Sequence, residues 1–342
     1  MTAGGREAAG GPARDGALLA IGIVGAGRHA AALADYQAPF GDVRVARWAA
    51  SPGGADLSVI RELATRIEAP FARDWEALVR DPDLQAVLVL SESAGASLVA
   101  EAALGAGKTV FCAAPAATRP EEANRLTGAA TGGRGVLLVG GTIRHSAAGR
   151  EALRLIRAGE LGPLHSLFAS VRLPAGGNGD RSSSAQRPVL EEAGWDLLDF
   201  IVAATGSQPS RVHAHVDTLF GAGAQDTAVC IVRFDNDLVA TIEVARCLPP
   251  SLAAPADGEV EIEVIGGRQA LRLQPGATAV SIYGRGTSLR PWLDPPVISM
   301  LDDLAAATNS GAPNAEGVAD VRRMVDLMEA IRAAAARPVA RL

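Results

Sequence analysis

The N-terminal part of the chain alternates short apolar runs with stretches of helical periodicity. Buried strands that read as continuous apolar runs are typical of a parallel sheet covered by helices on both faces. The pattern therefore predicts a doubly wound α/β domain at the N-terminus. The predicted strands cover 18–25, 43–50, the end of 75–90, 109–113 and 135–141, and the predicted helices about 28–38, 55–67, 97–107 and 120–131.

The pattern changes after about residue 160, where apolar and polar residues alternate one by one. In EVEIEVIG (259–266) three glutamates alternate with three branched apolar side chains. Such alternation predicts an open antiparallel sheet with one wet face and helices on the other. Further strands are expected at 165–173, 211–219, 227–235, 238–247 and 278–283, and a final helix at about 315–335.

These patterns divide the chain into three parts. Residues 1–16 predict a flexible tail, 17–145 the doubly wound domain, and 146–342 the antiparallel-sheet domain. The polar segment 174–188 predicts a long loop.

Composition narrows the class of protein. Of 342 residues, 48% are hydrophobic and 20% charged, which indicates a globular chain. The net charge of −6, with scattered basic residues, argues against a nucleic-acid partner. No apolar run is long enough for a membrane span. The three cysteines are widely spaced, which favours the cytoplasm and argues against a structural metal site. Among 32 basic residues only Lys108 is a lysine.

A glycine loop lies between the first strand and the first helix. In IGIVGAGRHA (21–30), Gly25 permits a tight turn and Gly27 lets the backbone approach a pyrophosphate. The following helix start offers free N–H groups to the phosphates, and His29 is expected on the phosphate side or exposed. The pattern predicts NAD or NADP binding, with a glycine-rich turn of any doubly wound protein as the alternative.

The second strand bears on the choice of cofactor. It ends in Ala50-Ser51-Pro52, without the acidic residue that usually binds the ribose hydroxyls. Ser51 and Arg28 can bind a 2′-phosphate, so NADP is slightly preferred over NAD. In the alternative, Ser51 is a turn residue and Arg28 is solvated.

Taken in order, several segments resemble the Gfo/Idh/MocA family of NAD(P)-dependent oxidoreductases. The resemblance implies that 17–145 is a dinucleotide-binding Rossmann domain and that 146–342 is a domain for substrate and oligomer contacts, whose last helix returns to the first domain. The open face of its sheet commonly forms dimer or tetramer contacts in this family, and a small-molecule substrate is expected. The segments are IGIVGAG (21–27), WEALVRDPDLQAVLVL (75–90), AALGAGKTVFCAAPAATRPEEANRL (102–126), VLLVGGTIRHS (136–146), ALRLIRAGELGPLHS (152–166) and VADVRRMVDLMEAIRAAAARPVARL (318–342).

The family's catalytic tripeptide is altered. Members typically carry Glu-Lys-Pro after the fifth strand, with the lysine close to nicotinamide and substrate. The matching residues are Ala113-Ala114-Pro115, so only the cofactor-side Pro115 is kept. A methyl group at Ala114 cannot donate a proton. Lys108 is expected at the opposite end of the strand as a solvated charge.

A second family signature has Asp, His and Asp at intervals of four and three residues. The matching positions hold Glu192, Asp196 and Asp199, which share one face if the segment is helical. Such a cluster can act in general acid/base catalysis, with one carboxyl pKa raised. The alternative is a structural role for these acids in capping and ion pairing.

Three further residues complete the predicted site. Ser91 replaces part of the family's Thr-Pro signature after the fourth strand and can contact the ribose or nicotinamide. Arg144 matches a family arginine and can bind a carboxylate or phosphate. The neighbouring His145 can exchange a proton, or is a surface histidine at a strand end.

Two functional hypotheses follow. In the first, the protein is an atypical dehydrogenase that transfers hydride to or from a small molecule, such as an imine or conjugated double bond. In the second, it is a catalytically inactive homologue that acts as a partner subunit or as a dinucleotide or ligand sensor. A redox-neutral reaction with transient use of NAD is a third possibility that no residue singles out.

Overall fold

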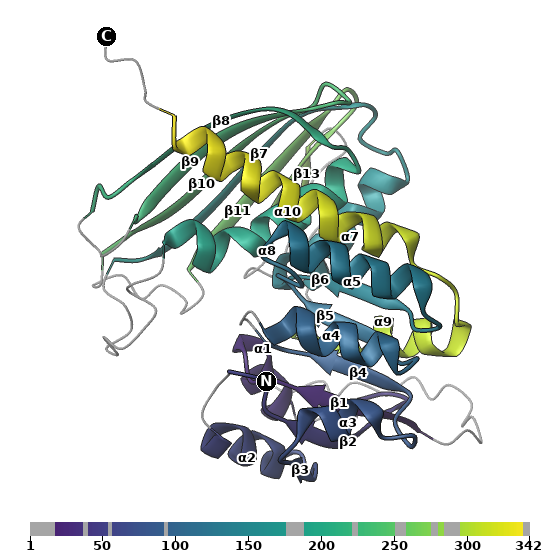
Figure 1. Cartoon of the computed structure of the whole chain (residues 1–342). Coiled ribbons are helices and arrows are strands. Elements are labelled where there is room, and N and C mark those ends of the chain that lie inside the picture. The colour runs from purple at the N-terminus through teal and green to yellow at the C-terminus, as the bar shows by residue number, and fades with distance from the viewer. Residues whose placement is uncertain are drawn as a thin grey trace, which may run out of the picture.

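The structure is a computed structural model that describes residues 18–36, 40–53, 57–91, 95–175, 188–220, 225–249, 258–274, 280–283 and 295–337. The predicted tail, most of the predicted loop 174–188 and the Arg28 side chain lie outside this description. Two sheets organise the described chain (Figure 1). No helix within the described ranges is long and apolar enough to cross a membrane.

The N-terminal sheet has six strands in the order β3-β2-β1-β4-β5-β6, and every adjacent pair is parallel. This confirms the predicted doubly wound domain. The order reverses between β1 and β4, and ligands of such sheets bind outside the carboxyl ends at this switch point. The strands are β1 Leu19–Val24, β2 Val43–Ala49, β3 Phe71–Ala72, β4 Ala86–Val89, β5 Thr109–Ala113 and β6 Leu137–Gly140.

Helices cover both faces of this sheet. One face packs against α3, α4, α5 and α10, and the other against α1, α2 and α9. Two of these helices come from the C-terminal end of the chain, as the resemblance implied. The bounds are α1 Arg28–Ala34, α2 Leu57–Arg66, α3 Trp75–Arg80, α4 Gly95–Gly105, α5 Pro120–Gly132, α9 Pro296–Ser310 and α10 Ala315–Ala335.

The second sheet has the order β13-β12-β11-β7-β10-β9-β8. The predicted antiparallel sheet is confirmed for most strand pairs, and one central pair differs, because β7 and β10 run parallel. The chain crosses from β7 through α8 to the sheet edge and returns by the meander β8-β9-β10, which ends beside β7. The elements are β7 Leu164–Pro174, α8 Val189–Thr205, β8 Pro209–Asp217, β9 Thr227–Phe234, β10 Val239–Leu248, β11 Glu259–Gly266, β12 Ala270–Leu273 and β13 Val280–Tyr283.

One face of this sheet is covered and the other is open. The covered face packs against α8, α10 and α7 (Ala147–Arg157), and α8 is buried along almost its whole length. A short helix, α6 (Thr142–His145), joins β6 to α7 and contacts α8. The covered face therefore brings α8 against the carboxyl end of β6, where the two domains meet (Figure 1).

Candidate dinucleotide and substrate site

The glycine loop lies tightly against the end of β4. Gly25 has a φ of 103°, and a Cβ there would lie 2.9 Å from the carbonyl carbon of Leu90. The Gly27 N–H donates to the Leu90 carbonyl oxygen at 2.7 Å, and Gly27 is the N-cap residue of α1. The loop therefore has the backbone approach that a dinucleotide-binding turn requires.

Trp48 supports the loop from below, a role that the sequence reasoning missed. Its indole is fully buried, and Nε1 donates to the Gly25 carbonyl oxygen at 2.8 Å. The bond fixes a carbonyl at the turn that precedes the phosphate-binding backbone. The available signal was a lone aromatic residue near the carboxyl end of the strand VRVARWA.

Ser51 and Ser91 meet at the carboxyl ends of β2 and β4. The Ser91 hydroxyl donates to the Ser51 hydroxyl at 3.0 Å, and both residues are buried. His29 is also buried, with Nε2 3.4 Å from the Thr142 hydroxyl of α6. The glycine loop, Ser51 and Ser91 thus lie at the carboxyl ends of β1, β2 and β4, and His29 connects the loop to α6.

The segment Ala113-Ala114-Pro115 is packed into the protein core. Ala114 is 3% exposed, its N–H donates to the Gly140 carbonyl oxygen at 3.1 Å, and its methyl group joins the same core as Ile143. Pro115 follows through a cis peptide bond and is buried. The methyl group of Ala114 cannot donate or accept a proton.

Lys108 lies at the amino end of β5, the opposite end from the glycine loop. The expectation that it is solvated is wrong, because it is 8% exposed and Nζ donates to the carbonyl oxygens of Asp81 and Leu84 at 2.5 and 2.6 Å. Burial lowers the pKa of this lysine. Its role is to connect β5 to the loop before β4.

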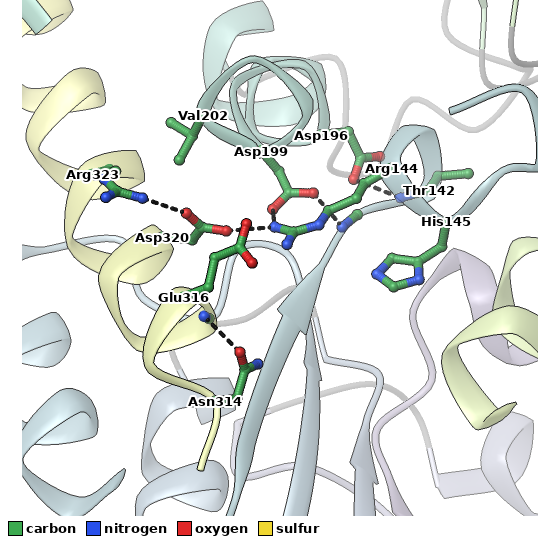
Figure 2. A network of polar contacts seen from close by, with 12 residues as sticks. Thr142, Arg144, His145, Asp196, Asp199, Val202, Asn314, Glu316, Asp320 and Arg323 are labelled. Carbon is green, nitrogen blue, oxygen red and sulfur yellow. Dashed lines mark hydrogen bonds and ion pairs between the residues drawn. The ribbon is translucent and has the colours of Figure 1, made fainter. Parts of the chain in front are cut away.

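Asp196 and Asp199 project from α8 toward the loop after β6 (Figure 2). Asp199 Oδ2 accepts the Gly141 N–H at 2.8 Å, and Asp196 Oδ1 accepts the Thr142 N–H at 3.1 Å. A Cβ on Gly141 would overlap Asp196 Oδ1, so only glycine permits this approach. The two carboxylates hold the backbone at the start of α6.

Arg144 joins three helices in a buried network. Its Nη1 lies 3.3 Å from Asp199 Oδ1 and 2.8 Å from Asp320 Oδ2, and Arg323 donates to Asp320 Oδ1 at 3.1 Å (Figure 2). Burial raises the pKa of Asp320, against the opposing effect of Arg144. The sequence reasoning missed Asp320, although it lies four residues before buried Met324 on the apolar face of α10.

The remaining predicted residues lie apart from this network. Glu192 forms an ion pair with Arg246 of β10, which is buried. His145 turns away from Asp196 and Asp199, and its ring lies edge-on to Phe111 at 5.0 Å (Figure 2). The structure thus brings together Arg144, Asp196 and Asp199, but not Glu192 or His145.

Comparisons with known proteins cover both domains. Residues 19–140 match the model of an oxidoreductase family with an NAD-binding Rossmann fold, and residues 150–272 match the GFO/IDH/MocA C-terminal domain. Inositol 2-dehydrogenase 2 of Saccharopolyspora erythraea is 28% identical over 239 residues, 68% of this chain and 67% of that protein. The uncharacterized oxidoreductase YrbE of Bacillus subtilis is 27% identical over 180 residues, so the match spans 51% of this chain and 52% of that relative.

Solved structures share the fold across almost the whole chain. Levoglucosan dehydrogenase, in a complex with NADH and levoglucosan, has a TM-score of 0.75 and 20% identity and matches 93% of this chain and 97% of that one. GenD2 from gentamicin A biosynthesis, in a complex with NAD, has a TM-score of 0.72 and 21% identity. The match covers 96% of this chain and 97% of that one. At these identities the likeness shows the fold alone.

Proposed function

Because the chain belongs to the Gfo/Idh/MocA family of NAD-binding oxidoreductases, we propose that it transfers hydride between a nicotinamide dinucleotide and a small molecule without a lysine as proton donor. The observation that carries this proposal is the glycine loop. Its Gly25 turn, the Gly27 N-cap and the buried Trp48 beneath it form a preorganised cradle for a pyrophosphate.

The protein's own residues would bind and orient the dinucleotide. The N–H groups at the start of α1 would hold the phosphates, with the Gly27 backbone fixed beside them by its hydrogen bond to Leu90. Ser51 and Ser91 lie at the strand ends where the ribose and nicotinamide are expected. The cofactor supplies the hydride, and these groups would set its position. Pro115 would border the nicotinamide side of the site.

NADPH is expected to bind at least as tightly as NADH. Ala50 stands where an acidic residue would repel a 2′-phosphate, and the Ser51 hydroxyl lies beside it. We also expect NADH to bind, since structural neighbours are complexes with NADH or NAD. Separate fluorescence titrations with NADH and NADPH measure this preference, and a much tighter NADH complex would refute it.

The substrate proposal rests on the altered proton relay. Alcohol oxidation needs a base at the substrate oxygen, and Ala114 offers none. Asp196 lies where the family has histidine, but one of its oxygens already accepts the Thr142 N–H. An imine or conjugated double bond, which needs less help from a protein acid, therefore fits better than a sugar alcohol.

A substrate screen tests this reaction type. Purified protein with NADPH or NADH is mixed with imines, enones and sugars, and nicotinamide absorbance is followed. Turnover of imines or enones in preference to sugars is expected. Tight cofactor binding without turnover on any class would remove the catalytic proposal and leave the dinucleotide site.

A catalytically silent homologue is the second candidate. It is favoured by the internal pairing of Asp199 with both Gly141 and Arg144, which gives this carboxylate a structural role. Restoring Ala114→Lys together with Asp196→His distinguishes a recently lost activity from a deeper change of function. Gain of polyol dehydrogenase activity in the double variant would support a recently lost activity. Absence of activity in the variant would support a deeper change of function.

A further inference from the structure

Three polar residues from three helices meet at the carboxyl end of β6. His29 comes from the start of α1, Thr142 from α6 and Asp196 from α8. His29 Nε2 lies 3.4 Å from the Thr142 hydroxyl oxygen, and Asp196 Oδ1 accepts the Thr142 N–H at 3.1 Å. Thr142 is therefore in contact with an imidazole through its side chain and with a carboxylate through its backbone.

The three residues differ in exposure. His29 is 6% exposed and Asp196 is 4% exposed, whereas Thr142 is partly exposed. Asp196 fixes the backbone of Thr142, and the neighbouring Gly141 has no Cβ that would overlap this carboxylate. Thr142 is thus the most accessible of the three, in a position that the buried Asp196 holds against His29.

This group lies over the half of the Rossmann sheet that would hold the nicotinamide. In a doubly wound sheet the two halves of a dinucleotide lie on opposite sides of the switch point, which here falls between β1 and β4. The adenosine ribose is usually bound at the end of the second strand, so the nicotinamide belongs to the side of β4, β5 and β6. Thr142 follows β6 on this side.

The same end of β6 adjoins Ala114, the position that offers only a methyl group. The Ala114 N–H donates to the carbonyl oxygen of Gly140, the last residue of β6, two residues before Thr142. An imidazole can accept a proton from a hydroxyl, and an imidazolium can donate one to it. The His29–Thr142 pair therefore has the chemistry of a proton relay on the side of the sheet where Ala114 has none.

We propose that Thr142 and His29 supply the proton that accompanies hydride transfer, an inference that rests on the proposed function. When bound, the reduced nicotinamide supplies a hydride to the carbon of an imine and is oxidised. The electron pair of the carbon–nitrogen double bond takes the Thr142 hydroxyl proton, and the Thr142 oxygen takes the Nε2 proton of His29, which becomes neutral. After the amine leaves, water returns a proton to His29 through Thr142. Thr142 touches the substrate, and His29 acts through it as a positioning residue.

Histidine NMR of the protein without dinucleotide tests the contact itself. The chain has five histidines, so the ring signals of His29 can be assigned by their loss in His29→Gln. Thr142→Val keeps the shape of the side chain but removes the hydroxyl, and it should shift these signals. Thr131→Val removes a hydroxyl of α5 that donates to the Thr127 carbonyl oxygen, and it should leave them unchanged. His29 signals that do not respond to Thr142→Val, or respond equally to Thr131→Val, would overturn the pairing.

Kinetics with NADPH and 2-methylpyrroline, a cyclic imine, test the proton transfer. Thr142→Val and His29→Gln should each lower kcat at least about hundredfold, while the dinucleotide affinity measured by fluorescence stays unchanged. Gln keeps a side-chain nitrogen that can hydrogen-bond to Thr142 but exchanges no proton, so a purely structural role of His29 would tolerate it. Thr142→Ser keeps the hydroxyl and should retain most of the activity. The matched control is His165→Gln, an exposed histidine of β7, which should leave kcat unchanged.

The possible outcomes separate this relay from the proposed function. Retained kcat in His29→Gln, or equal losses in Thr142→Val and Thr142→Ser, would overturn the relay and leave the hydride transfer standing. A loss of kcat that comes with a matching loss of dinucleotide affinity would assign His29 to cofactor binding and would also overturn the relay. Wild-type protein that binds NADPH but turns over neither 2-methylpyrroline nor cyclohexenone would remove the hydride transfer, and the relay with it.

Discussion

At the scale of single residues, small side chains decide the shape of the site. Gly25 and Gly141 each permit a backbone approach that a Cβ would block, and Ala114 places a buried methyl group directly after β5. The glycine at 25 was identifiable from its motif. The close approach of Gly141 to Asp196 was not, because it joins residues far apart in the sequence.

Gly141→Ala should destabilise the protein by about 2 kcal/mol, because the new Cβ overlaps Asp196 Oδ1 and forces α6 away from α8. Gly128→Ala is the matched control. It lies exposed within α5, where the new methyl group would have no atom of the described chain within 4 Å, and it should stabilise by about 0.5–1 kcal/mol. Urea unfolding of both variants measures the difference, and similar midpoints would contradict the packing described.

At the scale of elements, periodicity predicted most helices and strands of the Rossmann domain. Strand β5 was predicted at its observed bounds and α10 likewise, because each has an uninterrupted pattern. The two-residue β3 and helix α9 were missed, since neither carries a strong pattern of its own. The parallel pairing of β7 with β10 was also beyond the sequence, because pairing depends on the route of the chain.

The candidate site was also predictable only in part, because its contacts join residues that lie far apart in the sequence. Motif positions identified Ser51, Ser91 and the carboxylates of α8. Whether these carboxylates face substrate or protein depends on α6 and α10, which lie far away in the sequence. Asp320 and Trp48 were missed because their partners come from other elements.

The Arg144 network ties α6, α8 and α10 together, so removing its cation should be costly. Arg144→Met removes the cation shared by the buried carboxylates of Asp199 and Asp320 and should destabilise by about 3–5 kcal/mol. Arg80→Met, at an exposed pair with Glu76, should cost less than about 1 kcal/mol. Chemical denaturation compares the two, and equal losses would show that the network contributes little.

Asp320 should give stability a specific pH dependence. Its pKa is raised in the folded protein, so its contribution is fully present below the unfolded value of about 4 and is lost as pH rises through the folded value. Asp320→Asn cannot ionise and lacks this loss. The free energy of unfolding of wild type should therefore fall relative to that of the variant as pH rises above about 4; parallel pH curves would contradict this sign.

At the scale of the whole molecule, the open face of the second sheet carries exposed apolar side chains. Phe168 of β7, Thr241 of β10 and Ile231 of β9 lie in one cross-strand row, and the two apolar side chains are nearly half exposed. Exposed apolar groups in such a row are typical of an interface. We expect a dimer or tetramer formed through this face.

Light scattering after size-exclusion chromatography tests the interface. Phe168→Asp/Ile231→Asp should convert the oligomer to a monomer, because it places charges at the centre of the contact. Leu98→Asp, a similarly exposed residue on α4, is the control and should leave the mass unchanged. A wild-type monomer, or an oligomer that survives the double substitution, would contradict this arrangement.

We propose that the glycine loop binds a nicotinamide dinucleotide, and a fluorescence titration with NADPH and NADH tests this binding most directly. Wild-type protein should give saturable binding. Gly25→Ala, whose Cβ would strike the end of β4, should bind at least about tenfold more weakly while it still unfolds cooperatively. Absence of saturable binding to wild type at millimolar concentration, or equal affinity in folded Gly25→Ala, would contradict the account.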